Sequence, residues 1–216
     1  MTKTGKAVLA GAALALISAV ILIGCGKPKE TPIQKADRLL SKGDAASLEE
    51  AKTTLQEALK GEPNSARMHA LLASTYIKEA KSEQSRDKSE EIYNLAMGEL
   101  EKALEHYGQA GAPIDVYRQT VDVCRERAYL PKRFNVEKEI EGGVGPWEVK
   151  AMEKAIKAYD LGRARFPQDP AFTEDGARSL QNELAALKTL YVENVHRAWL
   201  SRPSGFVSPD KQKQVQ

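Results

Sequence analysis

The chain has 216 residues, of which 32 are Lys or Arg and 30 are Asp or Glu, so its formal net charge is only +2. This near balance excludes the strong basic field that typifies proteins binding nucleic acids, or anionic membranes by charge alone. Charged residues make up 29% of the chain and aromatic residues 6%, while Ala, Leu, Glu and Lys are abundant, which indicates an all-α fold of one domain.

The first 24 residues have the parts of a secretory signal. Lys3 and Lys6 form a short basic start, and an uncharged apolar run follows from Ala7 to Gly24. Because residues 1–24 hold two basic residues and no acidic one, the rest of the chain is formally neutral. The alternative is an uncleaved membrane helix, although the run is at the lower limit of the length that spans a bilayer.

The apolar run ends in Leu22-Ile23-Gly24-Cys25, which resembles the lipobox of bacterial lipoproteins. The resemblance implies that the Cys25 thiol carries diacylglycerol, that the chain is cut before Cys25 and that the new amino terminus is acylated. Three acyl chains exceed the two signals that stable anchoring needs. Because Gly26 stands where Asp retains some lipoproteins in the inner membrane, the resemblance also implies an outer-membrane protein facing the periplasm.

Cys124 is the only other cysteine, so a lipid on Cys25 leaves no intramolecular disulfide. We expect Cys124 to be a small buried hydrophobic residue on a helix. A reactive thiol is the alternative, because Arg125 and Arg127 are close in sequence and a basic setting activates a thiol.

The sequence predicts a linker at 25–31, a helical domain at 32–200 and a flexible tail at 201–216. Pro32 opens the first helix, and Ser47 caps the second in a capping box. Further helices are predicted around residues 66–77, 92–104, 114–124, 134–140, 147–166 and 173–200, with Gly- and Pro-containing turns between most of them. The charged segment 78–90 is either a loop or a solvated extension of the helices on both sides.

Three segments repeat one spacing of a small, a large apolar, a small and a turn-forming residue. They are Ala51, Leu55, Ala58 and Pro63; Ala96, Leu100, Ala103 and Gly108; and Ala155, Tyr159, Gly162 and Pro167. The spacing resembles that of the second helix of the tetratricopeptide repeat, and His69, Leu72, Ala73 and Tyr76 match the spacing of its first helix. The resemblance implies stacked helix pairs, with Ala58 and Ala103 buried between paired helices.

The chain departs from the family's period of 34 residues. Pro63 and Gly108 are 45 residues apart, and the third unit needs about 25 additional residues between Val121 and Ala155. The predicted fold is therefore a helical-hairpin solenoid similar to tetratricopeptide repeats but irregular in its third unit. The alternative is an irregular helical bundle with fortuitous periodicity.

The three histidines, His69, His106 and His196, lie in separate predicted helices. His69 takes a packing position of the repeat, so we expect a hydrogen-bonded imidazole in or near the core rather than a metal ligand. Glu193 and His196 form a single Glu-x-x-His motif, whereas di-iron bundles need two. The glycines at 142–145 lack the Lys-Ser/Thr of a phosphate loop, so they are expected to form a hinge. We expect no enzyme activity, no cofactor and no metal.

Two surface features each have two interpretations. The basic cluster of Arg125, Arg127, Lys132 and Arg133 is either a solvated face or a contact surface for an acidic partner. The last predicted helix has an apolar seam of Leu180, Leu184, Leu187, Tyr191, Val195 and Ala198. This seam either folds onto the helix at 147–166 or docks a partner through Tyr191, Val195 and Trp199.

The tetratricopeptide resemblance implies a concave face, made by the first helix of each pair, that holds a peptide or a partner domain. The residues expected to line it are Arg67, Ala70, Ser74, Ile77, Arg118, Gln119 and Asp122. We expect envelope proteins or peptides as partners, and neither nucleic acid nor a small-molecule substrate.

Three functional hypotheses follow from these features. The first is a scaffold or assembly factor similar to the tetratricopeptide-repeat lipoproteins that help build outer-membrane proteins or type IV pili. The second is a structural subunit of an envelope complex that uses the C-terminal helix. The third is a helical enzyme or carbohydrate-binding protein, against which the lack of an acid–base grouping weighs.

Overall fold

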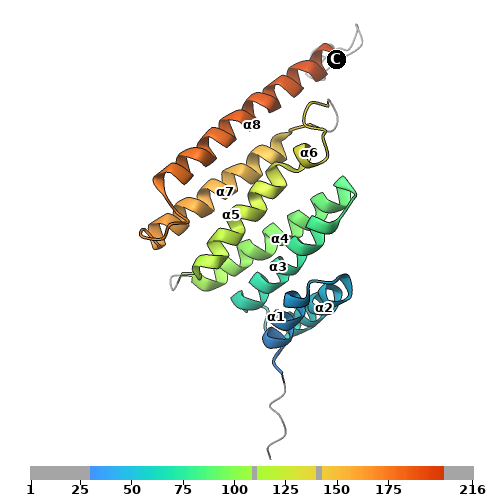
Figure 1. Cartoon of the computed structure of the whole chain (residues 1–216), viewed down its shortest axis with the longest axis vertical. Coiled ribbons are helices and arrows are strands. Elements are labelled where there is room, and N and C mark those ends of the chain that lie inside the picture. Colours follow the sequence, from blue (N-terminus) through green and yellow to red (C-terminus); the bar gives the residue numbers. More distant parts are fainter. Residues whose placement is uncertain (1–29, 109–110, 140–142, 202–216) are drawn as a thin grey trace, which may run out of the picture. The chain divides into compact units, whose positions relative to one another are not determined.

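The computed structural model describes residues 30–108, 111–139 and 143–201, in which all regular structure is helical (Figure 1), so the all-α prediction is confirmed. The helices are α1 (Pro32–Lys42), α2 (Ala45–Gly61), α3 (Ala66–Ser82), α4 (Arg86–Tyr107), α5 (Ile114–Ala128), α6 (Leu130–Arg133), α7 (Pro146–Arg165) and α8 (Glu174–Leu200). No helix within these ranges is both long and apolar enough to cross a membrane. The predicted signal segment, Cys25, the hinge glycine Gly142 and the tail from residue 202 onward lie outside the described residues.

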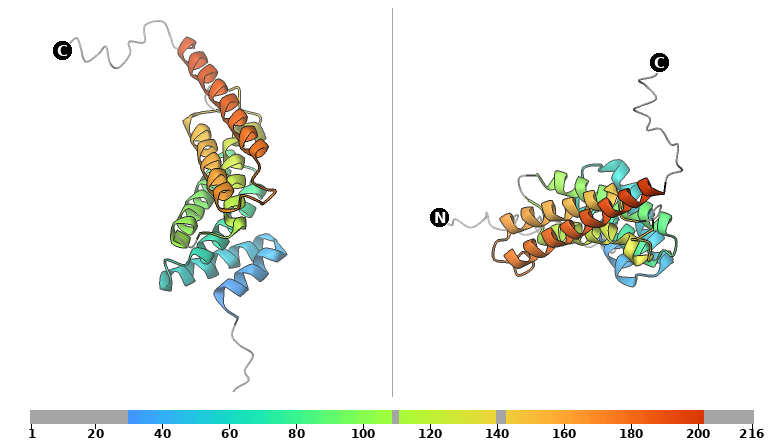
Figure 2. Two further views of the ribbon diagram at one scale, coloured as in Figure 1. Left: turned by 90° about the vertical axis from the view of Figure 1, so that its left-hand side faces the viewer. Right: turned by 90° about the horizontal axis from the view of Figure 1, so that it is seen from above.

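The eight helices of the described residues belong to one compact unit, which begins at Pro32. Four pairs of helices pack together: α1 with α2, α3 with α4, α5 with α7 past the short α6, and α7 with α8. The pairs are joined by contacts of α2 with α3 and of α4 with α5. In addition α3 contacts both α1 and α5, so the first helices of successive pairs are neighbours. The side-by-side course of α7 and α8 is visible in Figure 2.

The cap of α2 is Asp44 rather than the predicted Ser47. The Asp44 carboxylate accepts from the Ser47 backbone N–H at 2.9 Å and from its hydroxyl at 2.7 Å. These bonds lower the pKa of the Asp44 carboxyl. Both residues are good caps, but Asp44 follows Gly43, whose positive φ of 72° turns the chain out of α1, so the helix begins earlier than predicted.

The charged segment 78–90 extends the two helices on either side, which was one of the two predicted alternatives. Arg133 ties this hairpin to α6, because its guanidinium donates to the carbonyls of Ala80 at 2.9 Å and Lys81 at 3.1 Å near the end of α3. The orphan carbonyls at a helix end need such partners.

The predicted helix at 134–140 is wrong. The short helix α6 lies before it, with Pro131 in its first turn, and residues 134–139 form turns. Asn135 has a φ of 56°, a left-handed conformation that ends a right-handed helix. Pro131 therefore starts a helix instead of only breaking one, as its fixed φ allows.

The predicted packing positions lie in the core with one exception. The buried residues of the three segments are Ala51, Leu55, Ala96, Leu100, Ala103, Ala155, Tyr159 and Gly162. Ala103 is therefore buried as predicted, whereas the prediction for Ala58 is wrong, since Ala58 is only half-buried at the edge of the core.

Both interpretations of the basic cluster placed its four residues together on the surface. Arg127 is instead buried, with 2% of its area exposed, so the cluster as a whole is neither a solvated face nor a contact surface. Its guanidinium donates to Glu148 at 2.7 Å, to Glu90 at 2.5 Å and to the Asn94 side-chain oxygen at 3.2 Å. Glu148 is 4% exposed and also accepts from the backbone N–H of Gly145 at 2.9 Å. This buried network joins α4, α5 and the start of α7.

Helix α8 packs on α7, so the first of the two predicted alternatives holds for the buried part of its seam. Leu180 and Leu187 are buried, but Val195 is 51% exposed. The buried position near the C-terminal end belongs instead to Asn194, whose amide donates to the carbonyls of Val144 at 3.2 Å and Glu137 at 3.3 Å. The end of α8 thus holds the loop before α7 in place.

Cys124 is buried on α5, as expected. Burial raises the pKa of its thiol to about 12, so the thiolate is scarce near neutral pH. The neighbouring Arg125 and Arg127 point their charges to Glu183 and to the buried network, and the effect of burial on the pKa of the thiol outweighs the opposing effect of the Lys154 charge.

Candidate protein-binding groove

A groove of about 590 Å³ lies between α1, α3 and α5. All seven residues predicted for the concave face line it: Arg67, Ala70, Ser74 and Ile77 from α3, and Arg118, Gln119 and Asp122 from α5. The prediction missed the α1 residues Asp37, Leu40 and Ser41, and also Leu71, Lys78, Lys81, Asp115 and Val116. Helical spacing could have found those on α3 and α5, because each lies one to four positions from a predicted residue.

The floor of the groove is apolar and small-sided. Leu40, Ala70, Leu71 and Val116 are buried there, and Ile77 is half-buried on the wall. Small residues at 70 and 74 leave the hollow open between larger side chains on both sides. Such a floor can accept an apolar side chain of a ligand.

Polar contacts across the groove fix its walls. Arg67 of α3 pairs with Asp37 of α1 at 3.2 Å, and the Gln119 amide of α5 donates to the Ser74 hydroxyl of α3 at 2.5 Å. Farther along the same two helices, Lys81 pairs with Glu126 at 3.0 Å. These links connect α1 to α3 and α3 to α5 along the walls of the groove.

Arg118 connects the groove to the turn between α7 and α8. Its guanidinium lies 2.7 Å from the Asp169 carboxylate, which also accepts from the Ala171 backbone N–H at 2.9 Å. The pKa of Asp169 is lowered, first by the bond from Ala171 and then by Arg118. Two of the predicted binding residues, Arg67 and Arg118, are thus already engaged in ion pairs.

Lys78 and Asp122 differ from the other charged residues of the groove. Both are exposed, and neither side chain forms an ion pair or hydrogen bond with the described part of the chain. They lie on α3 and α5, one turn beyond the bond between Ser74 and Gln119. An incoming ligand can pair with them without breaking a contact within the protein.

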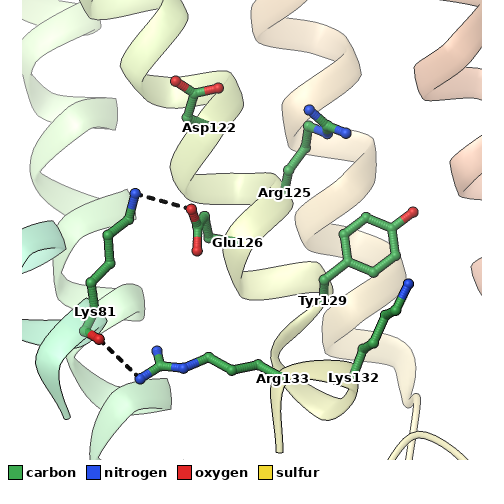
Figure 3. A pocket seen from close by; sticks show the side chains of 7 residues that line it. All are labelled: Lys81, Asp122, Arg125, Glu126, Tyr129, Lys132 and Arg133. Carbon is green, nitrogen blue, oxygen red and sulfur yellow. Dashed lines mark hydrogen bonds and ion pairs between the residues drawn. The ribbon is translucent and has the colours of Figure 1, made fainter.

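The groove continues into two neighbouring hollows along α5. One of about 650 Å³, lined by Lys81, Asp122, Arg125, Glu126, Tyr129, Lys132 and Arg133, is shown in Figure 3, where Lys81 faces Glu126. The other, of about 360 Å³, lies between α5 and α8 and shares Arg118, Asp122 and Arg125 with its neighbours. Burial, together with the nearby Glu183, raises the pKa of Tyr129 to about 12, so this phenol stays protonated as a donor.

The two remaining predicted binding residues lie away from the groove on α8. Tyr191 is half-buried against the core, while Trp199 is 64% exposed and stacks on His196 with ring centroids 6.5 Å apart. The structure therefore brings seven of the predicted residues into one groove and leaves Tyr191 and Trp199 at a separate surface.

Comparison with protein-family models, with curated proteins and with solved structures finds no match to this chain.

Proposed function

We propose that this protein is a lipid-anchored scaffold of the bacterial cell envelope that binds segments of partner proteins in the groove between α1, α3 and α5. Its fold is a helical-hairpin solenoid similar to the tetratricopeptide repeat. The observation that carries the proposal is the groove itself, because it collects all seven residues that the repeat pattern marks as the inner face.

The chemistry of the groove suits a polypeptide ligand. Its apolar floor accepts a side chain, and the unpaired Lys78 and Asp122 at the rim offer one charge of each sign. The hollows along α5 prolong the surface beyond the size of a single small molecule. An extended segment with apolar and charged side chains fits this arrangement, as it does in other helical-repeat proteins.

The anchor is the lipid on Cys25 that the lipobox resemblance implies. Residues 25–31 can span at most about 25 Å, so the helical domain stays close to the membrane surface. We expect the substitution Cys25→Ser to leave an unprocessed precursor that incorporates no radiolabelled palmitate. Labelling and maturation equal to the wild type would show that Cys25 is not the lipid site.

In a two-membrane source the wild type is expected in outer-membrane fractions of a density gradient, and recovery only in the inner membrane would contradict this sorting.

Two groove variants test the binding role. Asp122→Lys reverses an exposed charge that has no partner in the described chain, so its effect on stability is expected to be under about 0.5 kcal/mol. Ser74→Arg places a long side chain in the hollow. We expect each variant to reduce the recovery of a stoichiometric partner, in affinity capture from crosslinked membranes, by about tenfold or more.

The matched control is Leu95→Arg, which changes an exposed residue of α4 outside the groove. It should recover the partner as the wild type does. Unchanged recovery with both groove variants would contradict the proposed site.

A second candidate function is a structural subunit that associates through α8. Val192, Val195, Trp199 and Leu200 are all exposed near the end of this helix, which is a concentration of apolar side chains. Trp199→Ser distinguishes the two candidates, because it removes an aromatic anchor without touching the groove. Loss of the partner with Trp199→Ser, but not with Asp122→Lys, would favour the subunit function.

A further inference from the structure

Among the described residues, Asp122 alone lines the groove and also both of the hollows that continue it along α5. Its neighbours on the same face of α5, Arg118 and Arg125, each border only two of these three cavities. A polypeptide segment that passes along α5 from one cavity to the next therefore meets the Asp122 carboxylate.

Asp122 also differs from the other acidic side chains that line the three cavities, because each of the others has an ion-pair partner. The pairs are Asp37 with Arg67, Asp115 with Arg118, Glu126 with Lys81, and Glu183 with Arg125. Asp122 is exposed and forms no ion pair with the described part of the chain. Figure 3 shows its carboxylate apart from the contact between Lys81 and Glu126. A ligand can thus pair with Asp122 without breaking an ion pair within the protein.

The cations of the three cavities do not neutralise this carboxylate. Arg118 and Arg125, about one turn before and after Asp122 on α5, are both held in ion pairs with other carboxylates. Lys78 and Lys132 have no partner in the described chain, but Lys78 borders only the groove and Lys132 only the hollow beside α6. The free charge at the junction of the three cavities is therefore negative.

We propose that Asp122 sets the charge specificity of the groove by pairing with a Lys or Arg side chain of the bound polypeptide. This inference rests on the proposed function, because it names the chemistry of the segment that the groove holds. A basic side chain gains a carboxylate partner at the junction, whereas an acidic side chain is opposed by an unpaired charge of its own sign. An arginine can in addition donate two parallel hydrogen bonds to the carboxylate.

Selection of peptides from a random phage-displayed library tests this specificity, with the full-length chain in mild detergent as the target. Peptides count as groove ligands when they bind the wild type but not Ser74→Arg, in which a long side chain occupies the groove. We expect the aligned groove ligands to be enriched in Lys or Arg at one position. The same selection on Asp122→Lys should enrich Asp or Glu at that position instead.

A synthetic peptide from this selection gives the size of the preference. Replacing its basic residue by Glu should weaken binding to the wild type about tenfold, measured by fluorescence anisotropy, and should strengthen binding to Asp122→Lys. The control is Asp160→Lys, the same charge reversal at an exposed residue of α7. Asp160 has no partner in the described chain and lines none of the three cavities, so this variant should keep the wild-type preference.

The possible results separate this inference from the proposed function. Groove ligands without enrichment of Lys or Arg, or with the same charge preference for the wild type and Asp122→Lys, would overturn the role of Asp122 and leave the groove as a binding site. If no selected peptide depends on the groove, the proposed function fails and the inference fails with it.

Discussion

Arg127→Met is expected to lower the free energy of unfolding by about 3–5 kcal/mol. The substitution removes the only cation that contacts Glu148 within the described residues and leaves that carboxylate nearly fully buried. An uncompensated buried charge is among the most destabilising defects that a single substitution can create. Urea melts of the full-length chain measure the loss.

Two further variants identify the cause. Arg125→Met removes an arginine two residues away that is 43% exposed and pairs with Glu183, so its expected cost is at most about 1 kcal/mol. Adding Glu148→Gln to Arg127→Met should recover part of the loss, because the second substitution removes the stranded charge. The buried network would have no special importance if Arg127→Met cost no more than Arg125→Met.

Gly162→Ala is expected to destabilise the protein by about 1–3 kcal/mol, although Ala is the better helix former. A Cβ atom at position 162 would lie 2.5 Å from Cζ and 2.7 Å from Cε1 of the Phe172 ring. Phe172 is itself buried and packs edge-on against Tyr159, with ring centroids 5.2 Å apart, so it cannot easily move away. Gly162 is the second small residue of the third repeated segment, and this contact explains why it is small.

Gly98→Ala is the matched control, since Gly98 lies inside α4 and a Cβ there would meet no atom within 4 Å. Because Ala loses less conformational entropy than Gly when the chain folds, this substitution should raise the free energy of unfolding by about 0.5–1 kcal/mol. The two substitutions are chemically identical, so their opposite signs in urea melts isolate the contact with Phe172. A stabilising effect of both would contradict the close packing of α7 against the turn that precedes α8.

The helices and their faces could largely be predicted from the sequence, because burial of an amphipathic helix depends on local periodicity. Leu100 and Ala103 illustrate this, since their spacing alone placed them in the core, where both are fully buried. The choice between two good caps, Asp44 and Ser47, depends on how the chain leaves the preceding helix, and spacing does not contain that information.

Buried polar groups were the main features that the sequence did not reveal. An arginine is rarely fully buried unless it is paired, so the sequence alone predicts that Arg127 lies on the surface. Its partners Glu90 and Glu148 are distant in sequence, and only the packing of α4, α5 and α7 brings them together. Asn194 interrupts the apolar seam of α8 for a similar reason, because its amide satisfies two loop carbonyls.

The groove was predictable on α3 and α5, the two helices to which the repeat resemblance assigned the residues of the concave face. Its third wall was not, because nothing in the short helix α1 marks Asp37 or Leu40 as neighbours of α3. Only the structure reveals which charged residues of the groove are already in ion pairs. Arg67 and Arg118 are engaged in ion pairs, whereas Lys78 and Asp122 remain available to a ligand.

Site-specific photocrosslinking in cells tests the central claim, which is that the groove holds a partner polypeptide. A photoreactive amino acid would replace Ile77 on the groove wall, Leu95 on the exposed side of α4, or Trp199 on α8, each in the full-length chain. We expect Ile77 to give a discrete crosslinked product of defined mass, and Leu95 to give none. A product from Trp199 alone, or equal products from Ile77 and Leu95, would contradict the claim that this groove is the binding site.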